Sequence, residues 1–179
     1  MKRISVFGGS KPKPGEEAYT KALHLGKLLG EAGFTVLTGG YIGTMEAVSR
    51  GVAENGGYVI GVTCDEIESY RPVKPNCWLL EEIKHTTLRE RIFSLIEECD
   101  AALVLPGGIG TLTEVTTMWN LLLTSAISSR PLILVGPEWK ATNLDLYRNL
   151  GDYIPTSHRR LISFTPDADS AVALLLRNK

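Results

Sequence analysis

The residues best suited to chemistry follow the apolar run from Ala101 to Leu105. They form a turn with three glycines in four positions, Gly107, Gly108 and Gly110. Glycines let a backbone approach an anion closely, and a helix that begins at such a turn offers free N–H groups with a partial positive charge. The pattern predicts a phosphate site built from a strand, a glycine turn and the first turn of a helix, where we place Thr111 and Glu114.

Glu114 is the residue of this stretch that a phosphate site does not explain, because a carboxylate repels a neighbouring phosphate. One interpretation is structural, since an acidic side chain in the first turn of a helix is a favourable partner of the helix dipole. The other is catalytic, because carboxylates stabilise positive charge that develops at a sugar carbon and activate water. The residues alone leave both interpretations open.

Two more apolar runs end in glycine turns, namely Ile4 to Phe7 and Thr35 to Thr38. The candidate nucleotide contacts in these turns are Gly9, Ser10, Gly39, Gly40, Gly43, Thr44 and Met45. The alternative is that the glycines serve turn geometry alone and that Ser10 and Thr44 cap helices.

Helical periodicity separates the apolar runs, as at Ala18, Ala22, Leu25 and Leu29. We expect helices over residues 16–31, from the second turn to about Asn55, over 87–98, over 144–150 and over 167–177. Further strands are expected over 58–63, 132–135 and, at an edge, 161–164. Residues 64–77 are polar and contain prolines, which indicates a loop of functional length, and residues 78–81 are a candidate short strand.

Short apolar strands that alternate with helices predict β-α-β units. We therefore expect one domain over residues 1–179, of class α/β, with a doubly wound, Rossmann-like and mostly parallel sheet that has helices on both faces. In such a sheet the turns after the strands meet at the carboxyl edge, where ligands bind.

Composition excludes several classes of function. The 179 residues carry a formal net charge of −1, so we expect no nucleic-acid partner. No apolar run approaches the ~18 residues of a membrane helix, so we expect no membrane partner. The three cysteines form no C-x-x-C pair, which argues against a metal site and favours a cytoplasmic protein. No turn fits G-x-G-x-x-G or the P-loop G-K-[ST], which argues against dinucleotide and nucleoside triphosphate chemistry.

The stretch from Pro106 to Glu114 resembles the P-G-G-x-G-T-x-x-E signature of the LOG family, the cytokinin riboside 5′-monophosphate phosphoribohydrolases, which are often labelled "lysine decarboxylase-like". The turns 7–10 and 39–45 and the strand 57–62 resemble further parts of that family. The segment from Leu88 to Arg91 falls where the family has M-H-x-R-K, so the resemblance implies Arg91 as the catalytic arginine beside Glu114.

The resemblance implies hydrolysis of the N-glycosidic bond of a nucleoside 5′-monophosphate, with an AMP-like purine nucleotide as first candidate and without a cofactor. Lysine decarboxylation is not expected, because pyridoxal phosphate chemistry needs a lysine at the site, and only Lys11 and Lys13 lie near a glycine turn.

Departures from the family pattern keep a second function open. Arg89 and Ile92 stand where the family has histidine and lysine, and Glu46 stands where many members have glycine. The glutamate resembles a related branch, some of whose members are described as molybdenum-cofactor carriers. The alternative is therefore a non-catalytic protein that binds a nucleotide or the molybdenum cofactor.

The helix after the glycine turn, Leu112 to Thr124, is apolar over most of its circumference. Such a helix is buried on more than one side. We expect one side to face the sheet and the other to face a second subunit, in agreement with the dimers that the resemblance implies; a fully covered monomeric core is the alternative.

Overall fold

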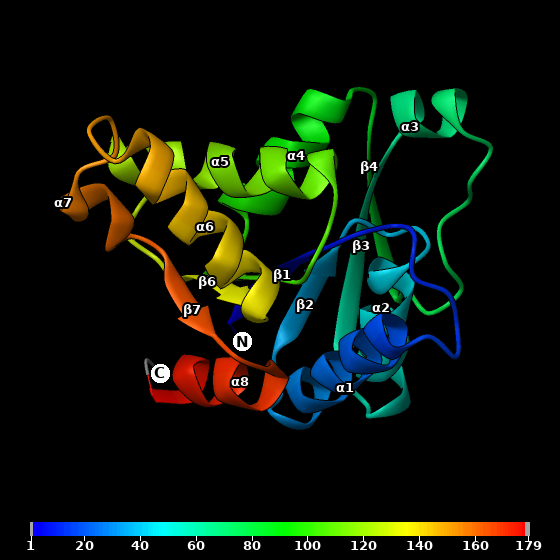
Figure 1. Ribbon diagram of the computed structural model, residues 1–179. Helices are drawn as coiled ribbons and strands as arrows, with labels where there is room; N and C mark the ends of the chain where they lie inside the picture. Colours follow the sequence, from blue (N-terminus) through cyan, green and yellow to red (C-terminus); the bar gives the residue numbers. More distant parts are fainter. Residues whose placement is uncertain (1, 178–179) are drawn as a thin grey trace.

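The computed structural model describes residues 2–177 and contains one seven-stranded parallel sheet (Figure 1). The strands are β1 (Arg3–Phe7), β2 (Thr35–Thr38), β3 (Tyr58–Cys64), β4 (Glu81–His85), β5 (Ala101–Val104), β6 (Leu132–Val135) and β7 (Ser163–Thr165). Their order across the sheet is β4-β3-β2-β1-β5-β6-β7, and every neighbouring pair is parallel. The chain winds outward from β1 and then from β5 in the opposite direction. The predicted doubly wound α/β fold is confirmed.

Helices cover both faces of this sheet. They are α1 (Glu17–Glu31), α2 (Thr44–Glu54), α3 (Asp65–Tyr70), α4 (Leu88–Glu97), α5 (Ile109–Leu123), α6 (Pro137–Leu150), α7 (Thr156–Arg159) and α8 (Ala168–Arg177). Figure 1 shows α1, α2 and α8 on one face, and α4, α5 and α6 on the other. The short helices α3 and α7 lie in connections between the main elements.

The strands supply side chains to both layers because successive residues of a strand point to opposite faces. In β1, Ile4 and Val6 belong to the core under α1, α2 and α8, whereas Phe7 belongs to the core under α4, α5 and α6. In β5, Leu103 and Val104 divide in the same way. This two-sided burial accounts for the continuous apolar runs in the sequence.

The reversal of winding falls between β1 and β5, where the glycine turns after these two strands lie side by side at the carboxyl edge. The turn after β2 is next to them, since β2 pairs with β1. Open α/β sheets bind ligands at such a reversal point.

The connection over residues 64–77 differs from its prediction as a loop, because its first half forms α3. Asp65 and Glu66 lie in the first turn of α3, where acidic side chains complement the helix dipole. The predicted strand over 78–81 is wrong. The strand is β4, with the sequence EEIKH, and only one of its side chains is a large apolar one. It is an edge strand and needs no continuous apolar run.

Two later elements also depart from the expected bounds. The helix predicted over 144–150 begins at Pro137, because proline suits the first position of a helix and Gly136 before it has a positive φ of 109°. The last strand lies over 163–165 instead of 161–164, and α7 was not predicted.

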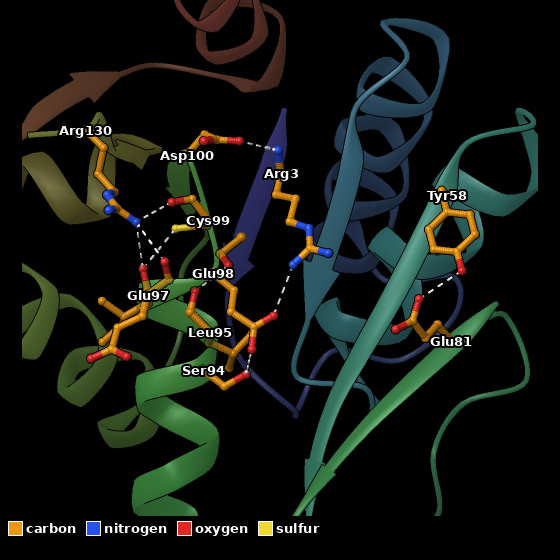
Figure 2. Close-up of polar contacts among 12 residues, drawn as sticks. Arg3, Tyr58, Glu81, Ser94, Leu95, Glu97, Glu98, Cys99, Asp100 and Arg130 are labelled. Carbon is orange, nitrogen blue, oxygen red and sulfur yellow. Dashed lines mark hydrogen bonds and ion pairs between the residues drawn. The ribbon is translucent and has the colours of Figure 1, made fainter. Parts of the chain in front are cut away.

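The amino edge of the sheet carries polar contacts that hold the end of α4 (Figure 2). The guanidinium of Arg130 donates to the carbonyl oxygen of Glu97, the last residue of α4, and to that of Cys99, two residues further along the chain. Arg3 donates from its backbone to Asp100 and from its side chain to Glu98. Within residues 2–177, no helix combines the length and apolar character that crossing a bilayer requires.

Candidate active site

A cleft of about 470 Å³ opens at the carboxyl edge beside the reversal of winding. Nine of the thirteen predicted site residues line it: Gly9, Ser10, Met45, Arg91, Gly107, Gly108, Gly110, Thr111 and Glu114. The cleft is thus bounded by the turns after β1, β2 and β5, by the first residues of α5, and by residues of α2, α4 and the region of α3. The predicted residues that do not line it are Gly39, Gly40, Gly43 and Thr44.

The peptide groups of Gly9 join the three glycine turns to one another. Its N–H donates to the carbonyl oxygen of Pro106 at 3.3 Å. Its own carbonyl oxygen accepts two hydrogen bonds from Thr44, one from the backbone at 2.9 Å and one from the hydroxyl at 3.0 Å. The turns therefore form one connected floor, which favours a fixed arrangement of backbone donors around a ligand.

Helix α5 begins at Ile109, earlier than the sequence indicated, directly beyond Gly108. Within residues 2–177, the N–H groups of Ile109, Gly110 and Thr111 have no hydrogen-bond partner, and no side chain caps the helix. These donors line the cleft and carry the positive end of the helix dipole. This end of α5 is suited to a phosphate.

The placement of Glu114 in the first turn of α5 was wrong. Because the helix starts at Ile109, Glu114 lies in its second turn, and the first turn contains no acidic residue. The carboxylate is therefore set back from the free N–H groups. The structural interpretation of Glu114 as a dipole partner loses its basis, because that effect falls off beyond the first turn.

Arg91 is buried, with an exposed fraction of 5%, and its guanidinium is held from three sides. Nε donates to the carbonyl oxygen of Val62 at 2.7 Å, and Nη2 donates to that of Gly39 at 3.0 Å. Nη1 lies 3.9 Å from Oε1 of Glu114, and the guanidinium carbon lies 5.7 Å from the centre of the Tyr41 ring. Arg91 thereby links α4 to β3, to the second glycine turn and to Glu114.

Glu114 is buried to an exposed fraction of 8%, and within residues 2–177 its one charged partner is Arg91. Burial raises the pKa of its carboxyl from 4.5 to about 7, because a low-dielectric surrounding penalises the charged form, and the charge of Arg91 opposes this effect. A carboxyl that titrates near neutral pH in a cleft is a candidate acid or base.

The second glycine turn packs against Arg91 and against the first glycine turn. A Cβ atom at position 39 would lie 2.1 Å from Nη2 of Arg91, so the guanidinium occupies the space that this glycine leaves. Gly43 has a φ of +80°, and a Cβ there would lie 2.5 Å from the carbonyl oxygen of Gly9. Gly40 also has a positive φ, of +77°. These glycines are required by packing and by backbone conformation.

Comparison with known proteins places this site in a family. The model of the SLOG cluster4 family matches residues 1–144. The chain belongs to the SLOG cluster4 family. The match contains every residue that lines the cleft and ends within α6, so the cleft lies in the part that this family shares.

Two curated relatives illustrate the likeness in sequence. A rice protein (Oryza sativa subsp. japonica), named "Probable cytokinin riboside 5′-monophosphate phosphoribohydrolase LOGL9", is 31% identical over 178 residues, which cover 96% of this chain and 76% of the relative. The pyrimidine/purine nucleotide 5′-monophosphate nucleosidase of Escherichia coli K12 is 28% identical over 148 residues, which cover 78% of this chain and 32% of that enzyme.

A solved structure shares the fold. The molybdenum cofactor binding protein of Rippkaea orientalis has a TM-score of 0.76 and 22% identity, with 98% of this chain and 96% of that chain covered. At this identity the likeness shows the arrangement of strands and helices alone.

Several residues that line the cleft were not among the predicted site residues, and they include Lys11, Tyr41, Ile67 and Arg71. Arg71 is the one arginine of residues 64–77, which were expected to form a functional loop, so its position in a proline-containing segment was the available signal. Tyr41 is buried behind Arg91, and its hydroxyl accepts from the N–H of Cys64 at 2.9 Å. Nothing in the sequence pattern indicated that contact.

The residues that depart from the LOG pattern lie away from the cleft. Arg89 is exposed and does not line it. Glu46 faces α1, where it accepts a hydrogen bond of 3.3 Å from the hydroxyl of Tyr19. Within residues 2–177, no group of three or more His, Cys, Asp or Glu side chains is arranged to hold a metal ion.

A second cavity, of about 490 Å³, lies on the other side of the first turn, between α1, α6 and α8. Thr44 and Pro106 border it, whereas Glu114 and Arg91 do not. Its charged residues include the pairs Lys21 with Glu17 and His24 with Asp169. The glycine-rich cleft therefore remains the better candidate site, because it combines free backbone donors with the buried carboxyl.

Proposed function

We propose that this protein hydrolyses the N-glycosidic bond of a nucleoside 5′-monophosphate and releases the free base and ribose 5-phosphate. An AMP-like purine nucleotide is the first candidate substrate. The observation that carries the proposal is the buried carboxyl of Glu114, which lies in the same cleft as a helix N-terminus with free N–H groups. The names of the rice and E. coli relatives support the substrate class.

The two halves of the cleft have separate tasks. The N–H groups at the start of α5 and the glycine turn bind the 5′-phosphate. Glu114 lies about one helical turn beyond them, roughly 5 Å along the axis, which is the scale of a ribose ring. This spacing supports a role for the carboxylate at the sugar carbon of the glycosidic bond while the phosphate is bound at the turn.

In the reaction, the C1′–N bond breaks and the base leaves with its bonding electrons, so positive charge develops at C1′. Ionised Glu114 stabilises that charge and takes a proton from the water that forms the new C1′–O bond. The base takes up a proton as it leaves. Arg91 acts on Glu114 as a positioning residue, since its nearest guanidinium nitrogen lies 3.9 Å from the carboxylate and two other nitrogens are bonded to backbone carbonyls.

The test is to incubate the purified protein with a panel of nucleoside 5′-monophosphates and to measure free base and ribose 5-phosphate. Glu114→Gln, which keeps the shape of the side chain, should lower kcat by about 10²- to 10⁴-fold while ribose 5-phosphate still binds. In the wild type, kcat/KM should fall as pH drops below about 7, because the carboxyl of Glu114, with a pKa of about 7, then becomes protonated. Absence of release for every nucleotide, or release unchanged in Glu114→Gln, would contradict the proposal.

A second candidate is a non-catalytic protein that binds a nucleotide or the molybdenum cofactor. The observation that favours it is the position of Arg89. This residue stands where the LOG motif has a histidine, but it is exposed and lies outside the cleft, so a side chain at this position does not line the cleft here. Binding of a nucleotide without turnover in the panel above would support this candidate over the hydrolase.

We also propose that the protein is a cytoplasmic homodimer that pairs through α5. Leu112 and Leu123 of this helix are 41% and 38% exposed, and Ile109 at its start is 79% exposed. Its opposite face, which includes Met118, is buried against the sheet. A cytoplasmic location is supported by the three cysteines, all of which are free. Nucleic acid is not among the partners that we propose.

A further inference from the structure

We propose that Arg71 is the side chain that binds the 5′-phosphate of the ligand, and that Arg91 is not. This inference rests on the proposed function insofar as it assigns a phosphorylated ligand to the same cleft. Three cationic side chains line that cleft: Lys11, Arg71 and Arg91.

Arg91 has little capacity left for a ligand. Nε and Nη2 are bonded to backbone carbonyls, and Nη1 faces the carboxylate of Glu114. A phosphate bound by Nη1 would lie beside that carboxylate and would be repelled by it. The charge of Arg91 therefore serves Glu114.

Arg71 has the opposite character, because most of its donors are unused. Within residues 2–177 it forms no ion pair, and its side chain makes one hydrogen bond, of 3.3 Å, from Nη1 to the hydroxyl of Ser10. Its Nε atom is buried and has no partner. A guanidinium has five N–H donors, and a buried donor without a partner costs stability until something bonds to it.

The surroundings of Arg71 fit a phosphate. Ser10, which it contacts, belongs to the first glycine turn, and this turn is bonded to the third turn through Gly9 and Pro106. An anion seated at the start of α5 would thus meet backbone N–H groups on one side and Arg71 on the other. The planar donor fork of arginine matches the geometry of phosphate oxygens. Lys11 is exposed, and solvent weakens what its charge can contribute.

The loop that carries Arg71 is tied to the floor of the site. The N–H of Arg71 donates to the carbonyl oxygen of Ile67 at 2.9 Å and so ends α3. Asn76 then bonds back to the second glycine turn, from its backbone to the carbonyl oxygen of Gly40 at 2.8 Å and from its side chain to those of Gly40 and Tyr41 at 3.0 Å. The backbone on both sides of Arg71 is therefore anchored, and the hydrogen bond to Ser10 keeps the guanidinium beside the first glycine turn.

The test is a comparison of binding with and without the phosphate group, by calorimetry. Arg71→Ala should bind ribose 5-phosphate about 10- to 100-fold more weakly than the wild type, and Arg71→Lys should recover part of that loss. Binding of the unphosphorylated nucleoside should change by no more than about twofold, because the contact that is removed is made to the phosphate alone. Arg148→Ala is the matched control, since Arg148 is exposed on α6 and does not line the cleft.

Kinetics give a second readout that a merely structural role would not produce. Arg71→Ala should raise KM for the 5′-monophosphate while kcat at saturation stays near that of the wild type, because the phosphate is held alike in the ground and transition states. Glu114→Gln should show the reverse pattern, with kcat lost and affinity for ribose 5-phosphate kept.

These measurements separate the two proposals. If the wild type shows no turnover but Arg71→Ala loses affinity for ribose 5-phosphate, Arg71 keeps its role and the hydrolase is wrong. If the wild type turns over and Arg71→Ala binds ribose 5-phosphate within threefold of it, the role of Arg71 is wrong and the hydrolase stands. If Arg71→Ala loses affinity equally for the nucleoside and for ribose 5-phosphate, the loop has collapsed and the inference is overturned. A wild type that binds neither phosphate nor ribose 5-phosphate would also overturn it.

Discussion

In the pair of Glu114 and Arg91, the proposed catalytic role of the carboxyl and the stability of the fold make opposite demands. The carboxylate is 3.9 Å from the nearest guanidinium nitrogen, beyond hydrogen-bond distance, and it is buried. Close contact with Arg91 would favour the ionised carboxylate and make it a weaker base. At the observed separation burial has the larger effect, and the pKa of the carboxyl rises to about 7. A group tuned in this way is costly to keep ionised.

That cost predicts how stability depends on pH. Between pH 4.5 and about 7 the folded protein keeps a proton on Glu114 that the unfolded chain, with a carboxyl pKa of 4.5, has lost. The folded state binds more protons in this window, so the free energy of unfolding falls as pH rises through it. Relative to Glu114→Gln, which has no such proton, the wild type should lose about 2–3 kcal/mol between pH 5 and pH 8.

Urea unfolding of both proteins at several pH values measures this difference. All other titrating groups are shared, so they cancel in the comparison to the extent that they do not interact with Glu114. The free energy of unfolding of the wild type, relative to Glu114→Gln, could instead stay constant or rise from pH 5 to pH 8. Either result would show that burial does not hold the carboxyl in its neutral form.

At the scale of the elements, the glycines around α5 fall into two groups. A Cβ at Gly107 would lie 2.1 Å from the hydroxyl oxygen of Thr111, so packing within the chain requires a glycine there. A Cβ at Gly108 or Gly110 would meet no atom within 4 Å, and neither residue has a positive φ. The fold does not require glycine at these two positions. The space beside them is part of the cleft.

We therefore expect Gly110→Ala to separate stability from binding. Gly110 lies in the first turn of α5 in a conformation that alanine adopts, so the free energy of unfolding should rise by about 0.4–1 kcal/mol. The added methyl group occupies the space above the turn, so affinity for ribose 5-phosphate should fall by about tenfold or more, the effect of roughly 1.4 kcal/mol. Chemical denaturation and calorimetry measure the two quantities.

Asn120→Ala provides the matched control on the same helix. Asn120 is exposed outside the cleft, and alanine is the better helix former, so this variant should gain stability without any change in affinity. Unaltered binding in Gly110→Ala would mean that the ligand does not pack against this turn.

The sequence predicted the main elements well where both faces of an element are buried. The bounds of β2 and β6 agree with their prediction because each is a continuous apolar or β-branched run between two layers. The prediction failed at β4, whose charged side chains suit an edge strand. It also failed at the start of α5, where the predicted glycine turn contains the first helical residues, Ile109 and Gly110. The spacing of apolar residues along the chain reveals neither the order of the strands in the sheet nor the residues that cap the helices.

The candidate site was predicted by residue type more than by role. The glycine turn and Glu114 came from the motif over Pro106 to Glu114, and Arg91 came from a second motif over Leu88 to Arg91. These residues do lie in one cleft. The different roles that we propose for Arg91 and Arg71 could not be predicted from the sequence, because they depend on the carbonyl oxygens of Val62 and Gly39, which accept from Arg91. Such backbone contacts join distant parts of the chain and leave no local pattern.

Helix α4 connects the two edges of the sheet, because its ends are held at opposite edges. Near its start, a capping box between Thr87 and Glu90 fixes the helix where it delivers Arg91 to the carboxyl edge. At its end, Arg130 binds the last carbonyl oxygens at the amino edge (Figure 2). The position of Arg91 therefore depends on contacts at both ends of the helix. The helix α5, which covers the same face of the sheet, has the exposed apolar side chains that we assign to a second subunit.

The proposed homodimer predicts a specific response to charge on α5. Leu112 is 41% exposed, and a glutamate there would place a charge within an apolar contact between two copies of the helix. Light scattering after size-exclusion chromatography should give twice the mass of one chain for the wild type and the mass of one chain for Leu112→Glu.

Leu144→Glu distinguishes an interface on α5 from a general effect of removing surface leucine. Leu144 is 54% exposed but lies on α6, so this variant should remain a dimer. Because Leu112 is in the same first part of α5 as the free N–H groups, a dimer through this face would also fix the helix end that we assign to the phosphate. Leu112→Glu should then bind ribose 5-phosphate more weakly as well as dissociate. A monomeric wild type, or two variants that dissociate equally, would contradict an interface on α5.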